Sequence, residues 1–118
     1  MNENNPLIHS AMQIILHAGD ARLNLSDAVK AASESDFSKA AAQMAEAEEN
    51  INKAHESQTE IIQNEMAGEN YEPCILFTHA QDTLMTIMSE MKFSREIIAL
   101  YQRVSALERG EGHGQQIS

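Results

Sequence analysis

Apolar residues recur along this chain every three or four positions, the spacing of a helix that buries one face. The first such stretch is predicted to begin at Pro6, a residue tolerated in an opening turn, and to run to about Ala32. The second has Asp36 as its expected N-cap and a heptad seam that extends almost to Gly68. The positions of that seam are Phe37, Ala40, Met44, Ala47, Ile51, Ala54, Gln58 and Ile61.

The third stretch is expected to begin at Pro73 and to end at Arg109, and it is apolar around much of its circumference. Two neighbouring helices cover only part of such a helix, so its remaining apolar positions predict an interface between subunits. We therefore predict an all-α fold, an antiparallel three-helix bundle with long helices over residues 6–109 that assembles into an oligomer. Residues 1–5 and residues 110–118 are predicted to be a flexible N-terminus and a flexible tail.

Composition supports the helical prediction, because alanine and methionine are abundant while valine is rare and tryptophan absent. Before the glycine-rich tail, the chain contains only two glycines, Gly19 and Gly68. Gly19 falls inside the first predicted helix, where a glycine costs about 1 kcal/mol relative to alanine. We expect a neighbouring helix to approach closely at this position.

The formal net charge is -10 at pH 7, from 18 acidic and 8 basic residues. Such a chain has no electrostatic footprint for nucleic acid or for an anionic membrane surface. Most of the excess acidity lies within residues 34–72, so the second helix is expected to be the solvated flank.

No apolar run approaches the roughly 18 residues of a membrane span. With no signal peptide and a single cysteine, Cys74, the sequence predicts a cytoplasmic protein without an internal disulfide.

Motifs for bound metals and nucleotides are missing. None of the five histidines has a glutamate three residues before it, so the Glu-x-x-His pairs of di-iron bundles are absent. The chain also lacks His-Glu-x-x-His, a phosphate-cradling glycine loop and Gly-x-Ser-x-Gly. These absences exclude most enzyme classes that use a bound metal or nucleotide.

His79 stands out because it lies in a polar segment of the most apolar helix. Asp82 and Thr83 follow it at i+3 and i+4, so the three side chains share one helix face. A neutral imidazole in such a setting is a competent nucleophile, and nearby hydroxyl or amide groups can donate to phosphate oxygens. On spacing alone, the pattern favours a buried histidine whose neighbours are hydrogen-bonded.

Three stretches carry a family resemblance: His17-Ala18-Gly19-Asp20-Ala21-Arg22, Ala54-His55-Glu56-Ser57-Gln58-Thr59 and His79-Ala80-Gln81-Asp82-Thr83-Leu84-Met85-Thr86. In this order, over roughly residues 7–105, the chain resembles the enzyme IIA component of lactose/cellobiose-type sugar phosphotransferase systems (PTS). The resemblance implies a homotrimer of three-helix bundles whose histidine accepts a phosphoryl group from the phosphocarrier protein HPr and passes it to a cysteine of enzyme IIB. It implies that His79 is this phosphohistidine. It also implies that Asp82 from three subunits binds one divalent ion, usually Mg²⁺, on the three-fold axis.

Thr83 departs from the family pattern, which usually has a second histidine at this position. A threonine still donates a hydrogen bond but cannot become cationic, so we expect transfer at His79 with Gln81 and Thr83 among the donors to the phosphate. Two alternatives stay open: a regulatory binding module that has lost efficient transfer, and a structural helical adaptor. His17 and His55 are expected to be packing or surface histidines, and nothing in the sequence identifies the sugar.

Overall fold

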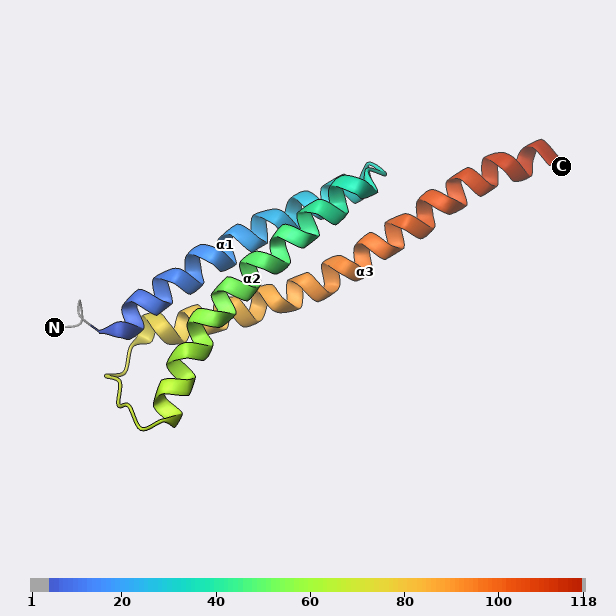
Figure 1. The fold of residues 1–118 in the computed structure, drawn as a ribbon. Coiled ribbons are helices and arrows are strands. Elements are labelled where there is room, and N and C mark those ends of the chain that lie inside the picture. Colours follow the sequence, from blue (N-terminus) through green and yellow to red (C-terminus); the bar gives the residue numbers. More distant parts are fainter. Residues whose placement is uncertain (1–4, 118) are drawn as a thin grey trace.

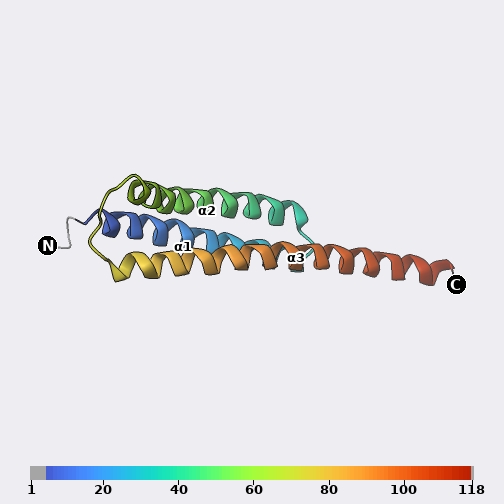
Figure 2. The same cartoon turned by 90° about the horizontal axis from the view of Figure 1, so that it is seen from below.

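The computed structural model of the protein describes the backbone of residues 5–117 and the side chains of residues 5–110. The fold consists of α1 (Pro6–Ser33), α2 (Phe37–Met66) and α3 (Ile75–Ile117). Successive helices run in opposite directions, and α1 lies between α2 and α3 (Figure 2). Over the described backbone there is no strand. The predicted all-α arrangement of three long helices is confirmed.

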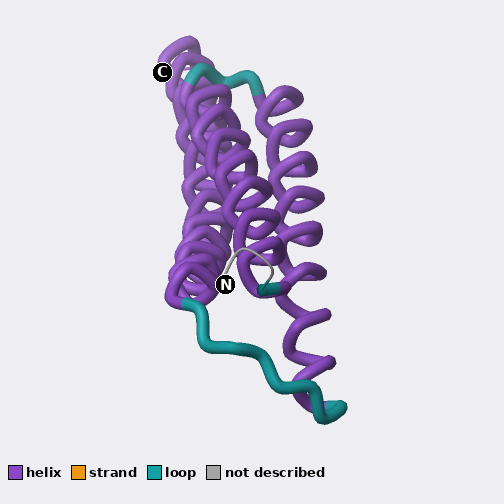
Figure 3. Tube along the Cα trace, turned by 90° about the vertical axis from the view of Figure 1, so that its left-hand side faces the viewer, coloured by secondary structure: helices purple, strands orange, loops and turns teal. Residues whose placement is uncertain are grey.

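The molecule is elongated, with extents of 74 × 22 × 19 Å. Much of this length comes from α3, which extends past the turn between α1 and α2 (Figure 1). The two connections lie at opposite ends of the bundle, a short turn at one end and a longer loop at the other (Figure 3). A thin bundle of this kind leaves a large share of its surface uncovered.

Alanine dominates the buried face of α1. The buried apolar residues of α1 are Leu7, Ala11, Ile14, Ala18, Ala21, Leu25, Ala28, Ala31 and Ala32. Those of α2 are Ala40, Ala47, Ile51, Ala54 and Ile61, all on the predicted heptad seam. Small side chains let the helices approach closely, and Ile14, Leu84 and Ile87 are the largest side chains fully buried between them.

Gly19 lies outside this core. It is exposed, and no atom lies within 4 Å of a Cβ placed there, so the close approach expected at Gly19 does not occur within one copy.

The turn between α1 and α2 is built on a left-handed residue. The amide of Asp36 donates to the carbonyl of Ala31 at 2.9 Å, and the amide of Ser35 donates to Ala32 at 3.0 Å. These two bonds form a Schellman motif, and Ser35 adopts a φ of 64°. The Asp36 carboxylate then accepts from the amide of Lys39 at 3.1 Å, so Asp36 is the N-cap of α2, as predicted.

Replacing Ser35 by glycine is expected to raise the free energy of unfolding by about 0.5–1 kcal/mol, because glycine adopts the left-handed conformation without steric cost. Part of the gain is offset by the greater freedom of glycine in the unfolded chain. Urea denaturation at fixed protein concentration measures the change. Ser35→Ala, which keeps the strain, is the matched control, and an equal stabilisation by alanine would contradict this explanation.

The prediction of a flexible segment over residues 1–5 is corrected at Asn5, which lies at the start of α1. Asn5 is buried and is the N-cap of α1, because its side chain accepts a hydrogen bond from the amide of Leu7 at 2.9 Å. The side-chain nitrogen Nδ2 of Asn5 donates to the backbone carbonyl of Glu72 at 2.9 Å, which connects the α2–α3 loop to the start of α1. Residues 1–4 lie outside the described part of the chain.

Both ends of α3 also differ from the prediction. The helix begins at Ile75 rather than Pro73, and the carbonyl of Cys74 accepts the first hydrogen bond of the helix. It continues to Ile117 rather than ending at Arg109, since glycines weaken a helix without stopping it and no proline interrupts it here. The predicted flexibility of the tail remains a prediction, and residue 118 lies outside the described residues.

Candidate functional site

The buried face of α3 decides which way its polar residues point. Its buried apolar side chains are Phe77, Ala80, Leu84, Ile87 and Met91. Because these lie on one stripe, His79 and Asp82 fall outside it and are exposed, while Gln81 and Thr83 are half-buried. The alternative of a buried, structural His79 is therefore wrong. An exposed imidazole on a rigid helix is accessible to a macromolecular partner.

Thr83 is bonded to the backbone of its own helix. Its hydroxyl donates to the carbonyl of His79 at 3.0 Å, so the two residues are linked although their side chains are not. A hydroxyl has one proton, and in this conformation that proton is not free for a phosphate oxygen. Among the described side chains, His79 and Asp82 take part in none of the side-chain hydrogen bonds or ion pairs.

Among the described residues of a single copy there is no group of three or more His, Cys, Asp or Glu residues that could hold a metal ion. Asp82 supplies one exposed carboxylate per copy. The Mg²⁺ that the resemblance implies would use this carboxylate together with those of further copies. Carboxylate oxygens are suitable ligands for such a hard cation.

The outward face of α3 carries a second heptad pattern beyond Asp82. Its members are exposed apolar residues with steps of four, three, four and three: Phe93, Ile97, Leu100, Val104 and Leu107. Their exposed fractions range from 38% at Val104 to 64% at Leu107. We call this set the α3 seam. It explains why α3 is apolar on most sides, since one stripe packs inside the copy and the α3 seam faces outward.

Residues 9–102 match the family described as "PTS system, Lactose/Cellobiose specific IIA subunit". The chain belongs to this family. It is therefore a PTS IIA component, a member of a phosphotransfer chain, and the resemblance drawn from the sequence is confirmed. No helix in the described residues is long and apolar enough to cross a membrane.

Relatives in the PTS IIA family agree over most of the chain. The chain is 43% identical over 93 residues to the lichenan-specific phosphotransferase enzyme IIA component of Bacillus subtilis strain 168, a match that covers 79% of this chain and 84% of that protein. The crystal structure of the PTS cellobiose-specific enzyme IIA from Bacillus anthracis aligns with a TM-score of 0.81 at 37% identity, covering 85% and 92% of the two chains. A solution structure of the IIA(Chitobiose)–HPr complex from Escherichia coli aligns with a TM-score of 0.72 at 30% identity, covering 84% and 96%.

The other two stretches that resemble the PTS family, residues 17–22 and residues 54–59, lie on α1 and α2 and make structural contacts. Arg22 on α1 forms a two-pronged pair with Glu90 on α3, at 2.9 and 2.7 Å, and the hydrogen bonds and charge of Glu90 raise the pKa of Arg22. This pair was not predicted from the sequence, because its members are far apart in the chain. His55 is exposed on α2, with its Nδ1 3.2 Å from the Thr59 hydroxyl. His17 is half-buried, and its buried Nδ1 has no hydrogen-bond partner among the described residues.

Proposed function

We propose that this PTS IIA component carries a phosphoryl group on His79, accepting it from phospho-HPr and passing it to a cysteine of enzyme IIB in the cytoplasm. The bond from phosphorus to the HPr histidine breaks as the bond to the His79 nitrogen forms, and the second transfer exchanges that bond for one to sulfur. The observation that carries the proposal is the exposed His79 within the matched family segment. The related Escherichia coli IIA(Chitobiose) forms a complex with HPr, which supports HPr as donor.

Phosphoryl transfer to a histidine requires few groups from the surrounding protein. A neutral imidazole nitrogen attacks phosphorus with its own lone pair, so no separate general base is needed. Phosphoryl transfer depends on in-line positioning and on donors that stabilise the equatorial oxygens. Thr83 follows His79 at i+4 and shares its helix face, while Gln81 follows at i+2. Both are the proposed donors. Thr83 first has to rotate away from the carbonyl of His79, to which it donates at 3.0 Å.

Incubation with enzyme I, HPr and phosphoenolpyruvate tests the proposal. The intact mass is expected to increase by one phosphoryl group, and addition of IIB is expected to remove it. Omitting HPr is the control and should leave the mass unchanged. A chain that stays unmodified in the complete mixture would contradict the proposal.

The active form is proposed to be a homotrimer, as the resemblance implies, with the α3 helices side by side. The α3 seam supports parallel self-association, since it has the β-branched Ile97 and Val104 at one core position and Phe93, Leu100 and Leu107 at the other. In that register Arg103 lies opposite Glu108 of the adjacent copy, a complementary pair at flanking positions. Such a seam alone favours two strands, so the number of copies is decided by sedimentation, where a dimer would contradict the trimer.

Asp82 lies on the same outward side of α3 as the seam and is the proposed ligand for Mg²⁺. Three ionised carboxylates brought together in a poorly solvated interior repel each other, and each costs desolvation energy. A hard, oxygen-preferring cation relieves both. One Mg²⁺ per trimer would therefore neutralise the charge of the three Asp82 carboxylates.

One observation favours an alternative function, a regulatory module with an inefficient phosphorylation site. This observation is the hydrogen bond from the Thr83 hydroxyl to the carbonyl of His79 in the same helix. Thr83→His discriminates between the two functions. For a competent carrier we expect less than about a threefold change in the rate of transfer from phospho-HPr, a difference of under 1 kcal/mol in the barrier. Rapid-quench kinetics measures the rate, with Thr78→His as the matched control five residues away on the same helix. A gain of a hundredfold or more would instead indicate a degenerate site.

A further inference from the structure

The first turn of α3 leads directly into His79 and has few buried side chains. Ile75 and Leu76 are 90% and 39% exposed, whereas Phe77 is buried at 7%. In an α-helix the amide of each residue donates to the carbonyl four residues earlier, so the acceptor for the His79 amide is Ile75. The position of the His79 backbone therefore depends on whether this first turn stays formed.

The chain enters this turn through a stiff segment, Glu72-Pro73-Cys74. Proline fixes its own φ and restricts the residue before it to an extended backbone. The carbonyl of Glu72 is part of the planar peptide bond to Pro73, so a contact that fixes this carbonyl also restricts where Cys74 lies. The carbonyl of Cys74 in turn accepts from the amide of Thr78 at 3.2 Å, in the first turn of α3.

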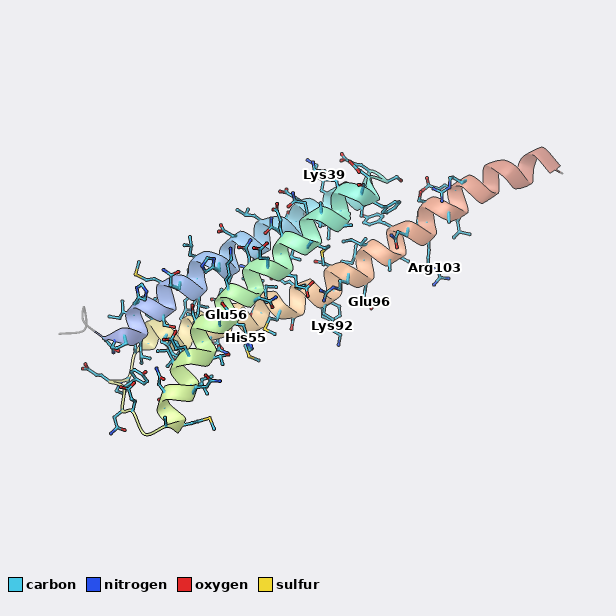
Figure 4. All side chains as sticks on the ribbon, in the orientation of Figure 1. Lys39, His55, Glu56, Lys92, Glu96 and Arg103 are labelled. Carbon is cyan, nitrogen blue, oxygen red and sulfur yellow. The ribbon has the colours of Figure 1, made fainter. Side chains whose placement is uncertain are left out.

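Asn5, which is 8% exposed, holds the carbonyl of Glu72 in place. The Nδ2 group of Asn5 donates to that carbonyl at 2.9 Å, and its Oδ1 accepts from the amide of Leu7 at 2.9 Å. Because both ends of one planar amide are bonded, the side chain has a defined orientation. The start of α1, the α2–α3 loop and the start of α3 lie together at this end of the bundle (Figure 4), so this one side chain connects α1 to the entry of α3.

We infer that Asn5 is a positioning residue for His79, acting through the backbone from Glu72 to Ile75. The inference rests on the proposed phosphoryl carrier and adds a residue that the transfer requires away from the reacting atoms. Phosphoryl transfer depends on in-line geometry, and misplacing a reacting group by about 1 Å can lower the rate about a hundredfold. Asn5 touches no reacting atom. It fixes the first turn of α3 relative to α1, and His79 lies on the turn that follows.

Two substitutions separate this role of Asn5 from its role as the N-cap of α1. Asn5→Asp and Asn5→Ser both keep an oxygen that accepts from the amide of Leu7, but neither has a nitrogen that donates to the carbonyl of Glu72. Loss of this hydrogen bond is expected to make amide hydrogen exchange in residues 75–79 about fivefold faster. At saturating phospho-HPr, transfer to His79 is expected to be at least about threefold slower, with an unchanged half-saturating concentration of phospho-HPr.

Ser10→Ala is the matched control. Ser10 is 7% exposed, and its hydroxyl donates to the carbonyl of Ser57 at 2.9 Å, which joins α1 to α2. This bond has the same length and the same kind of acceptor as the bond from Asn5 to Glu72, but it does not involve α3. Its loss is expected to lower the urea midpoint about as much as the Asn5 substitutions do. The exchange of residues 75–79 and the transfer rate at saturating phospho-HPr should stay those of the unmodified chain.

The exchange measurement needs no phosphorylation, so it separates this inference from the proposed function. Unchanged exchange or an undiminished transfer rate in the two Asn5 variants would overturn the inference, and so would an equal loss of rate in Ser10→Ala. An unmodified chain that accepts no phosphoryl group would overturn the proposed function, and the exchange data alone would then decide whether Asn5 holds the start of α3. Faster exchange and slower transfer, both confined to the Asn5 variants, would support the inference and the function together.

Discussion

Replacing His79 by alanine is expected to reduce phosphorylation by phospho-HPr below detection, because the imidazole nitrogen is the atom that forms the bond to phosphorus. His79 is exposed on α3 and outside the core stripe, so its removal should leave the fold intact. Intact-mass measurement over time gives the phosphorylated fraction, and circular dichroism checks the helices.

His55→Ala is the matched control for His79→Ala, because it removes another exposed imidazole from a neighbouring helix. We expect this variant to be phosphorylated at the rate of the unmodified chain. His17→Ala is a second control and should lower stability more than rate, since His17 is half-buried. Undiminished phosphorylation of His79→Ala would contradict the assignment.

Replacing Asp82 by leucine is expected to tighten the assembly and to make it insensitive to chelators. In the proposed trimer the change removes three converging carboxylates, and like charges a few ångströms apart cost on the order of 1 kcal/mol or more per pair. We therefore expect at least a tenfold lower dissociation constant than for the unmodified chain treated with a chelator. Sedimentation velocity at neutral pH, with and without Mg²⁺, measures the change.

Two controls accompany the Asp82 variant. Asp82→Asn removes the charge with little change in shape and should also tighten the chelated assembly. Glu56→Leu removes an exposed carboxylate from α2 and should leave association and its chelator response unchanged. A trimer weakened by Asp82→Leu, or a monomer under all conditions, would show that Asp82 does not lie at a shared axis.

The helices were predictable because their signals are local. The N-cap Asp36, the heptad seam of α2 and the stop near Gly68 depend on neighbours within a few residues, and all three are observed. The end of α3 was not predictable in the same way. Glycines after Arg109 lower helix propensity without a stop signal, and the helix continues to Ile117.

The geometry around His79 was only partly predictable, and the role of His79 as the phosphorylated residue stays a prediction. The pattern around His79 placed the polar residues on one face, but the outward direction of that face depends on which stripe of α3 the other helices bury. The bond from Thr83 to the carbonyl of His79 depends on a side-chain rotamer that the sequence does not specify. The pair of Arg22 with Glu90 joins residues from different helices and follows from packing alone.

Site mapping of the phosphoryl group tests the central claim most directly. The chain is phosphorylated by phospho-HPr, digested at alkaline pH, where phosphohistidine is stable, and sequenced by tandem mass spectrometry. The predicted result is one phosphoryl group on His79 in the peptide that contains Asp82 and Thr83, lost when IIB is added before digestion. A phosphoryl group on any other residue, or none in the presence of active phospho-HPr, would contradict the account.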